Sequence, residues 1–530
     1  MKLKTIFSFL ILSVSLYTAM AQKQFTGVAR NDYFDKREAV IPYAGMQKGK
    51  DGYYLFRVRN LPKDDLPALK PKKYELLQFD NNLKIKNIQE TLINFQPDKS
   101  QIEHFTIQDN ILLVFASSRN KKDKKEYIHL HKFDAQNLKP INEPERIYES
   151  AYVGMFKRMS RFEFIPSPDS TKTLLFEENT IKKGKREVGL CLLDKTGRVE
   201  WNRKFILEKS KKNRNVIIRR ALLDNDGNVL LLKKDFLTTE VKFKQSIFHY
   251  ASKFSLLYLK NNGDKKTDIP IFDNDYHLTD LDMGFQNNGL PFFLGYYSDN
   301  KKTSTSGVIQ AVCTSLENNP IIEPSFQPFS EKNMKSNDKS KFFKYKMEGF
   351  VVRHIHQNQD NTFLLAGERL QKKRIPVKGI SKLTETEEEG IIPSTILVSK
   401  TAAENGEVLW ANKIFRRGGV DRKNSSNFHI HFDNDKLFFI YNDYVKDKEF
   451  YNSDNVKPSF KDYFNRQSKI FVTRFFSNGK PKTISLYPSS EELFLTFHPS
   501  CTSLISKNEV ILFEDDKKRE RMELVKLILD

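Results

Sequence analysis

Residues Leu222–Asp235 read LLDNDGNVLLLKKD and give the strongest hairpin signal in the chain. An apolar pair precedes the turn residues Asp224–Asn228, and the apolar run Val229–Leu232 follows them. Asp-Gly between two β-forming runs favours a type I′ turn, whose two central residues both need positive φ. The stretch therefore predicts two antiparallel strands joined by a tight turn.

The same arrangement of turn and apolar run occurs seven more times along the 530 residues. The eight turns fall near positions 51, 109, 169, 226, 288, 360, 434 and 507, so the steps are 58, 60, 57, 62, 72, 74 and 73 residues. A nearly fixed period is typical of repeat architectures, in which each repeat is one small unit of secondary structure.

A second hairpin follows within each repeat. Two repeats share the pattern Gly-x-Val-x-Trp-x-x-Lys, at Gly197–Lys204 and Gly406–Lys413, which uses both tryptophans of the chain. Four strands per repeat, joined by tight turns, resemble the β-propeller architecture over the whole mature chain. We predict an all-β, eight-bladed β-propeller closed by an N-terminal strand, with seven blades plus a capping sheet as the alternative.

The first 21 residues have the features of a secretory signal peptide. Lys2 and Lys4 precede the apolar run Ile6–Tyr17, and Ala19–Ala21 provides a small-x-small cleavage site. The apolar run is too short to span a bilayer. We therefore expect cleavage after Ala21, one propeller domain over residues 22–530 without a transmembrane segment, and a periplasmic location, with an extracellular one as the alternative.

The chain ends suggest how the ring closes. The last repeat offers the strands Cys501–Ser506, Val510–Phe513 and Met522–Leu529 and lacks a fourth. Phe25–Ala29 is a spare strand near the N-terminus. We predict that Phe25–Ala29 completes the last blade, because this pairing would cover an open sheet edge.

The connections between the predicted strands fall into a short and a long set. In a propeller, the second-to-third and fourth-to-first connections leave on one face, and here these are long, as in Thr180–Arg186 and Gln371–Pro393. Binding residues concentrate on loops that a rigid scaffold displays. The face with the long connections is therefore the predicted binding face.

Charge favours an anionic partner at that face. The formal charge of +21 falls to +19 when Lys2 and Lys4 are removed. Export excludes nucleic acid, which leaves lipopolysaccharide headgroups, an acidic polysaccharide or an acidic protein surface. The predicted partner-binding residues are the basic residues of the long connections: Lys121, Lys122, Lys124, Lys125, Lys182, Lys183, Lys185, Arg186, Lys211, Lys212, Arg214, Lys372, Lys373 and Arg374.

A second candidate site lies on the first strands, which line the central channel of a propeller. His354 and His356 match His429 and His431 in the next repeat, and the preceding repeat has Asp280 and Asp282 at neighbouring positions. Residues at i and i+2 project from one face of a strand, and this donor set suits a divalent transition metal. The alternative is that these positions are polar because the channel holds water, which Glu163 and Arg220 in the same column favour.

Other chemistry is scarce in the sequence. The three cysteines, Cys191, Cys313 and Cys501, lie in separate repeats, so we interpret them as small buried hydrophobes rather than a disulfide framework. We find no nucleophile elbow, phosphate-binding loop, dinucleotide-binding glycine pattern or Cys-x-x-Cys. No cofactor is therefore predicted, apart from the metal considered for the channel.

Two classes of function remain open. We favour a non-enzymatic interaction scaffold, since the chain resembles the periplasmic propeller subunits of outer-membrane assembly and secretion machines in its architecture. The resemblance implies a protein partner at the outer membrane, in an assembly or type IX-like secretion complex. The alternative is a propeller enzyme, either a metal-dependent hydrolase of lactonase-like type or a glycan-acting one, which would use the channel residues.

Overall fold

The computed structural model describes the chain in segments, almost all of them strands. They are residues 29–35, 41–42, 46–59, 73–91, 101–120, 122–151, 162–180, 186–207, 216–236, 252–260, 262–271, 277–298, 305–316, 321–330, 332, 350–378, 385–415, 428–433, 436–444, 468–486, 495–497, 503–506, 509–516 and 521–529. Within these segments there are 34 strands and no helix, so none of them contains a helix that could cross a membrane. The predicted signal peptide lies outside them.

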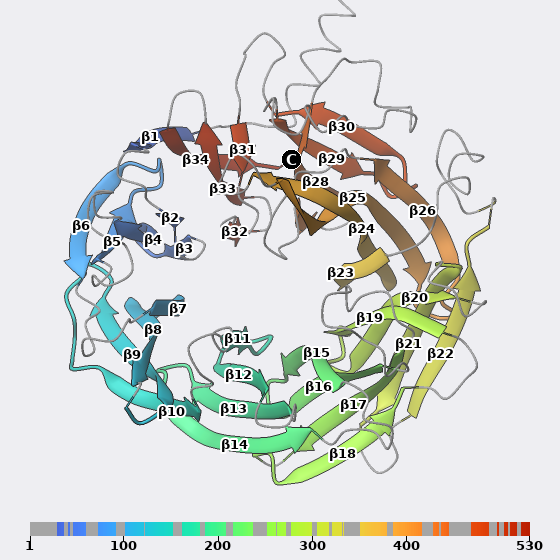
Figure 1. The fold of residues 1–530 in the computed structure, drawn as a ribbon, viewed down its shortest axis with the longest axis horizontal. Coiled ribbons are helices and arrows are strands. Elements are labelled where there is room, and N and C mark those ends of the chain that lie inside the picture. The colour runs from blue at the N-terminus through green and yellow to red at the C-terminus, as the bar shows by residue number, and fades with distance from the viewer. Residues whose placement is uncertain are drawn as a thin grey trace, which may run out of the picture.

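The strands are arranged as a ring of sheets around a central opening, as Figure 1 shows. The sheets of the N-terminal half are made of the following strands: β2 (Ile41–Pro42), β3 (Gln47–Gly49), β4 (Gly52–Arg59), β5 (Lys73–Phe79) and β6 (Ile85–Thr91); β7 (Gln101–Gln108), β8 (Ile111–Asn120), β9 (Lys125–Asp134) and β10 (Glu145–Ala151); β11 (Phe162–Pro166), β12 (Lys172–Thr180), β13 (Arg186–Asp194) and β14 (Val199–Leu207).

The eight-stranded sheet in the middle of the chain contains β15 (Val216–Leu223), β16 (Val229–Phe236), β17 (Ser252–Lys260), β18 (Lys265–Pro270), β19 (His277–Phe285), β20 (Pro291–Ser298), β21 (Gly307–Ser315) and β22 (Ile321–Pro328). The next two sheets contain β23 (Phe350–Gln357), β24 (Thr362–Lys378), β25 (Glu385–Ala402) and β26 (Val408–Phe415), then β27 (Phe428–Asp433), β28 (Lys436–Tyr444), β29 (Ser468–Phe475) and β30 (Pro481–Ser485).

The β-propeller prediction is confirmed, but the count of eight blades is not. Five sheets are separate blades with a path of four antiparallel strands: β2-β4-β5-β6, β7–β10, β11–β14, β23–β26 and β27–β30. The remaining strands group differently for two physical reasons. The pair Ser252↔Leu278 joins β15–β18 and β19–β22 into one sheet, and the last sheet combines both ends of the chain.

An N-terminal strand closes the ring, as predicted, and in the described residues it begins at Ala29. The closing sheet contains β31 (Leu495–Phe497), β32 (Ser503–Ser506), β33 (Glu509–Asp516), β34 (Arg521–Ile528) and β1 (Ala29–Asp35). β1 pairs antiparallel with β34, from Ala29↔Lys526 to Asp35↔Arg521. Of the predicted strand Phe25–Ala29, only Ala29 lies in the described residues, where it pairs with Lys526. The partner edge, β34, is the one expected.

The type I′ turn expected from the sequence is present at one of the two turns described next and absent at the other. At Asp109 and Asn110 both φ angles are positive, 47° and 64°, and the pair Gln108↔Ile111 closes a two-residue turn. The turn at Asp224–Asn228 is wider, because the flanking pair is Leu223↔Val229. Within it only Gly227 has positive φ, at 90°, so it is not type I′; the glycine supplies the left-handed position of a longer loop.

The hydrophobic core is divided between neighbouring sheets. One cluster joins β11–β14 to β15–β17 through residues such as Leu190, Trp201 and Leu231. Cys191 and Cys313 are free and buried, as predicted, whereas Cys501 lies outside the described residues. The core therefore connects each blade to the next, as expected when no single four-stranded sheet can bury both of its faces alone.

Trp410, from the second copy of the repeated pattern, forms a contact between one blade and the next. The Nε1 of Trp410 on β26 donates a hydrogen bond to the carbonyl of Ser477 at 3.0 Å, in the turn between β29 and β30. The next blade accommodates the indole because Gly479 has no side chain: a Cβ there would lie 2.5 Å from Trp410. The pattern thus marks a contact between blades.

Candidate functional site on the channel wall

The inner strands place the predicted channel residues on one continuous wall. In Figure 1, β7, β11, β15, β19 and β23 lie at the inner edge of the ring. Glu163 is on β11, Arg220 on β15, and Asp280 and Asp282 on β19, while the four histidines are on β23 and β27. The first strands therefore do form the column that the sequence predicts, and the contacts of each residue decide what it can do.

Asp280 is the centre of a buried ionic cluster. Its side chain is fully buried, and its two carboxylate oxygens accept hydrogen bonds from Nε and Nη2 of Arg219 at 3.2 and 3.1 Å. Nζ of Lys234 lies 3.3 Å from the same carboxylate, and only 2% of the Lys234 side chain is exposed. Burial opposes the ionisation of Asp280, but Arg219 and Lys234 outweigh it and hold the pKa of the carboxyl below its usual value.

The cluster also reaches the next inner strand. The backbone N–H of Val352 on β23 donates to Asp280 at 2.9 Å, and the carbonyl of Val352 accepts a hydrogen bond from Arg219 at 2.7 Å. The cluster therefore links β15, β16, β19 and β23, which lie on three successive repeats of the sequence. A buried carboxylate whose oxygens are occupied by two cations and an amide has no free position for a metal ion.

Asp282 and Arg220 form a weaker pair next to this cluster. Nε of Arg220 lies 3.7 Å from Asp282, whose carboxylate also accepts a hydrogen bond from the Met283 backbone N–H at 2.9 Å. The Arg220 side chain is 52% exposed, so this ion pair is partly solvated. Asp282 consequently has a cation beside it, as Asp280 does.

The histidines serve mainly as aromatic surfaces between inner strands. His356 on β23 stacks on Phe432 of β27, with ring centroids 4.2 Å apart, and His354 lies 5.9 Å from Phe428. His431 lies 6.0 Å from the ring of Phe438. The ring contacts of these three histidines are therefore with phenylalanines, while His429 is near enough to His354 to help lower its pKa.

Burial keeps His354 and His429 neutral. It lowers the pKa of His354 to about 3 and that of His429 to about 4. A neutral imidazole can bind a metal, but within the described residues no three His, Cys, Asp or Glu side chains are grouped to hold one. The metal site thus stays a prediction without support from this geometry, because its two aspartates already have cationic partners.

The same use of histidine occurs at a position that the sequence analysis did not single out. His104 on β7 stacks on Phe164 of β11, with centroids 4.9 Å apart and planes inclined by 11°. Burial lowers the pKa of His104 to about 4. In both places a histidine of one inner strand stacks on a phenylalanine of the next, so a His in one repeat and a Phe at or beside the matching position of the following repeat is the signal.

Charged residues at bulges were also missed. The inner strands β7, β15 and β23 each have a register shift that inserts one residue, Glu103, Arg219 and Arg353 respectively. A bulge redirects the side chain of the inserted residue. Arg353 pairs with the fully buried Glu368 at 2.9 Å, and Ser117 donates to Glu103 at 2.6 Å. A charge in the middle of an apolar strand was the available signal.

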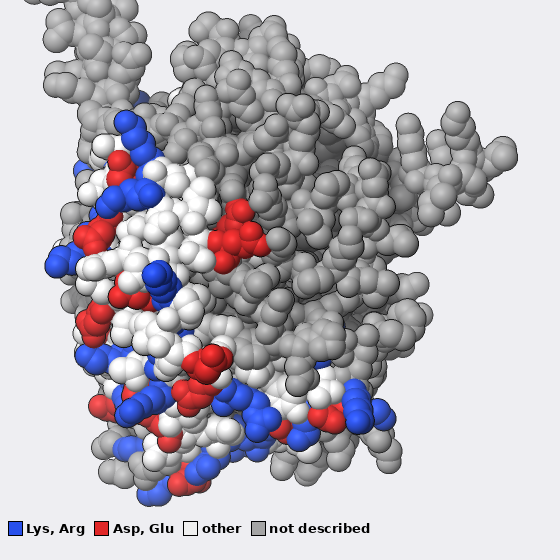
Figure 2. All heavy atoms as spheres, turned by 90° about the vertical axis from the view of Figure 1, so that its left-hand side faces the viewer, with Lys and Arg blue, Asp and Glu red and all other residues white. Residues whose placement is uncertain are grey.

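The predicted basic residues are only partly within the described residues. Lys122 and Lys124 are exposed, while Lys125 pairs with Glu149 at 2.6 Å and Arg186 pairs with Glu178 at 3.3 Å. On the side of the molecule that Figure 2 shows, basic and acidic side chains are interspersed. The following predicted residues lie outside the described residues, or their side chains do: Lys121, Lys182, Lys183, Lys185, Lys211, Lys212, Arg214, Lys372, Lys373 and Arg374.

Two of the expected long connections, Arg119–Lys125 and Gln371–Pro393, are not long loops. The pair Asn120↔Lys125 closes a short hairpin, so Arg119–Lys125 is not a long loop. Gln371–Pro393 was also expected as a loop, but β24 and β25 continue through most of it as a two-stranded ribbon, from Leu370↔Pro393 to Lys378↔Glu385. Backbone pairing explains the difference, because an antiparallel ladder satisfies the peptide groups whatever the side chains are.

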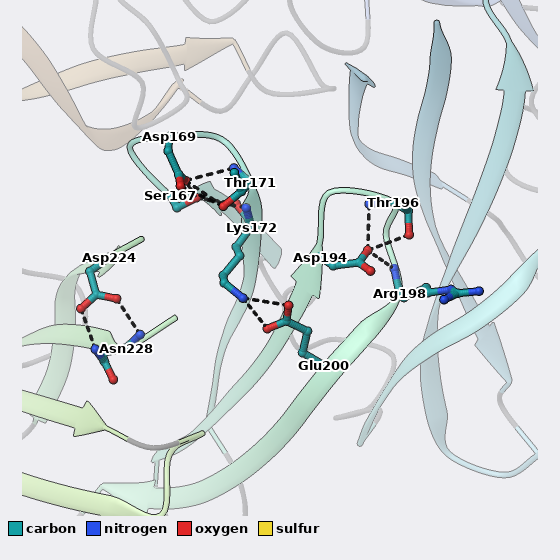
Figure 3. Close-up of polar contacts among 10 residues, drawn as sticks. All are labelled: Ser167, Asp169, Thr171, Lys172, Asp194, Thr196, Arg198, Glu200, Asp224 and Asn228. Carbon is teal, nitrogen blue, oxygen red and sulfur yellow. Dashed lines mark hydrogen bonds and ion pairs between the residues drawn. The ribbon is translucent and has the colours of Figure 1, made fainter. Parts of the chain in front are cut away.

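The opposite, tight-turn face is held together by its own polar residues. Figure 3 shows that Lys172 reaches both carboxylate oxygens of Glu200, each at 2.8 Å. Asp194 accepts hydrogen bonds from the backbone N–H groups of Thr196 and Arg198, at 2.8 and 3.0 Å. These carboxylates stabilise turns and ion pairs, which is a structural role.

Comparison with known proteins adds no family. No protein-family model and no curated protein sequence matches the chain. Among solved structures, a variant of the Synechocystis apocarotenoid oxygenase is 8% identical with a TM-score of 0.39, covering 94% of this chain and 90% of its own. The β-propeller domain of the Trilobed protease from Pyrococcus furiosus is 9% identical with a TM-score of 0.32, covering 87% and 99%. A protein of unknown function from Dyadobacter fermentans is 11% identical with a TM-score of 0.32, covering 66% and 90%. Such values carry no information on function.

Proposed function

We propose that the chain is a non-enzymatic interaction scaffold of the periplasm that binds an anionic partner through its long-connection face. The observation that carries the proposal is that the side chains of the channel wall make structural contacts with one another. Asp280, Arg219 and Lys234 connect successive repeats, and the histidines stack on phenylalanines. Residues used in this way hold the ring together, which leaves the displayed connections as the place for binding.

The finer parts of the proposal rest on the sequence. The predicted signal peptide supports export, and the formal charge of +21 supports a partner that is anionic. We assign the chain to the accessory subunits of an outer-membrane assembly or type IX-like secretion complex by analogy of architecture alone. Lipopolysaccharide headgroups would offer the same anionic chemistry as an acidic protein surface.

We also infer that the ring is built from eight sequence repeats. Support comes from the eight-stranded sheet, whose halves β15–β18 and β19–β22 each follow the order of one repeat and meet in the pair Ser252↔Leu278. The closing sheet would be the last repeat, completed by β1. A solved structure in which β15–β22 belong to one repeat would contradict this count.

A charge-reversal experiment tests the binding face. The variant replaces five basic residues of two neighbouring connections by Glu: Lys182, Lys183, Lys185, Lys211 and Lys212. A matched control reverses five exposed basic residues of the tight-turn face: Lys50, Lys195, Arg198, Lys265 and Lys480. Capture of outer-membrane fragments should fall in the first variant and with rising salt, and should persist in the control.

The result also separates the two sources of negative charge. Vesicles containing lipopolysaccharide, without membrane proteins, should bind the native chain only if headgroups are the partner. Equal capture by both variants, unaffected by salt, would refute the proposed face. Elemental analysis addresses the enzyme alternative, since a stoichiometric metal that is lost in His354→Ala with His429→Ala would favour it.

A further inference from the structure

One blade carries an extension that the others lack. β24 is 17 residues long and β25 is 18, whereas their neighbours β23 and β26 have 8 each. β23 pairs with β24 only as far as Arg369, and β26 pairs with β25 only from Thr395. Among the described strands, residues 370–378 and 385–393 therefore pair only with each other. We call this two-stranded segment the ribbon.

The two strands of the ribbon carry equal and opposite charge. The first has four basic residues and the second has four acidic ones: Lys372, Lys373, Arg374 and Lys378, and Glu385, Glu387, Glu388 and Glu389. The register places Arg374 opposite Glu389 and Lys378 opposite Glu385. The ribbon as a whole is thus neutral, with a basic strand and an acidic strand side by side.

The ribbon is poorly suited to pairing with a further strand at its edges. Pro376 lies in the basic strand and Pro393 in the acidic one. A proline has no N–H and is tolerated in a ladder when the missing donor faces outward, so each edge lacks a donor. Proline and lysine on free edges are devices that prevent strand addition. A face of the ribbon is therefore the surface that remains for docking.

We propose that the ribbon is a self-association element, and that its occupant is the ribbon of a second copy of this chain. Two ribbons stacked about a two-fold axis parallel to their length place the basic strand of each copy over the acidic strand of the other. Such an interface is self-complementary and closes at the dimer. A two-stranded ribbon alone is only marginally stable in water, and a second ribbon about 10 Å away would cover one of its faces.

Charge also decides against a polyanion as the occupant of this segment. The four glutamates neutralise the four basic residues, so a polyanion at the ribbon would meet as many negative as positive groups. A second ribbon offers both signs in the matching arrangement. This inference does not depend on the binding face proposed above, which the Lys182–Lys212 reversal tests separately.

Two complementary variants test the proposal. The acidic-ribbon variant combines Lys372→Glu, Lys373→Glu and Arg374→Glu, and the basic-ribbon variant combines Glu387→Lys, Glu388→Lys and Glu389→Lys. Light scattering after gel filtration should show the native mature chain as a dimer at about 0.05 M salt. It should show monomers near 1 M salt, where the screening length is about 3 Å. Each variant alone should be monomeric at either salt concentration, and an equimolar mixture should form a heterodimer at low salt.

A variant that lacks the ribbon provides a second test if one of the charge-reversed variants misfolds. Replacing residues 371–392 by a two-residue Asn-Gly turn leaves the parts of β24 and β25 that β23 and β26 flank. This chain should be folded, by circular dichroism, and monomeric. A native chain that is monomeric at low salt, a dimer that survives removal of the ribbon, or folded variants that fail to associate on mixing would each overturn the proposal.

Discussion

Asp280→Asn is the sharpest test of the ionic cluster. The substitution keeps the shape of the side chain but removes the charge that Arg219 and Lys234 share, so both cations lose this buried counter-ion. Removing one partner of a buried ion pair costs about 3–5 kcal/mol. We expect a loss of this size in the free energy of unfolding, and the Val352 contact contributes to it because an amide accepts the N–H less strongly than a carboxylate does.

The second substitution shows whether the cost comes from an unpaired charge. Lys234→Met is close in volume and removes one of the two cations. In the Asp280→Asn background it should therefore restore part of the lost stability. Burial lowers the pKa of Lys234, so the stability of Asp280→Asn should rise with pH between that lowered pKa and the normal lysine value.

Urea unfolding followed by tryptophan fluorescence measures both effects. Trp201 and Trp410 lie in two different blades and report on the ring as a whole. A loss below about 1 kcal/mol for Asp280→Asn would refute the reasoning, since it would match an ordinary hydrogen bond. A double variant less stable than Asp280→Asn alone would refute it as well.

Three further predictions concern the contact between blades, the closure and pH. Gly479→Ala should destabilise the protein by about 1–3 kcal/mol, because φ at Gly479 is +79° and a Cβ would meet Trp410. In the control Gly289→Ala, φ is +83° and the space is open, so only the strain of the backbone conformation should reduce stability. Equal shifts in the melting temperature of the two variants would contradict the contact with Trp410. Deleting residues 22–35 should lower the melting temperature by exposing the edge of β34, and an unchanged value would contradict the closure. Burial lowers the pKa of His104 and His429 to about 4, so these two groups lower stability as pH drops from about 6.5 toward 4. Burial raises the pKa of Glu103 and Glu178 to about 7, so these two groups lower stability as pH rises from about 4.5 to 7. The two effects oppose each other between about pH 4.5 and 6.5, so stability should change little there and fall on either side. A stability that keeps rising below about pH 4.5 would contradict the histidine assignment.

The architecture was predictable from the sequence because turns and apolar runs are local. Asp224–Asn228 and its equivalents place the first and second strands of the repeats correctly, and the closing partner of the last strand was inferred from a missing element. The turn type at Gly227 could not be predicted, because Asp-Gly fits both a two-residue turn and a wider one. The number of separate sheets could not be predicted from the sequence either, since the single pair Ser252↔Leu278 joins two repeats into one sheet.

The channel wall was harder to predict because its contacts are not local. Arg219 and Lys234 lie 61 and 46 residues before Asp280, and spacing within one strand does not reveal such partners. The i, i+2 spacing of the histidines was correct, but the phenylalanines of the next strand determined their environment. The sequence predicts a loop in place of the ribbon because strands of charged residues lack the apolar alternation by which strands are identified.

The distribution of charge leads to one more inference about the binding face. The ion pairs that the structure shows, such as Lys125 with Glu149, Lys172 with Glu200 and Arg353 with Glu368, add nothing to the net charge. The ribbon is neutral as well, with four residues of each sign. The excess of +21 must then come from basic residues outside these pairs. Lys182–Lys185 holds three basic residues among four and Lys209–Arg214 holds four among six, which is why charge reversal in these two segments is the decisive test of an anionic partner.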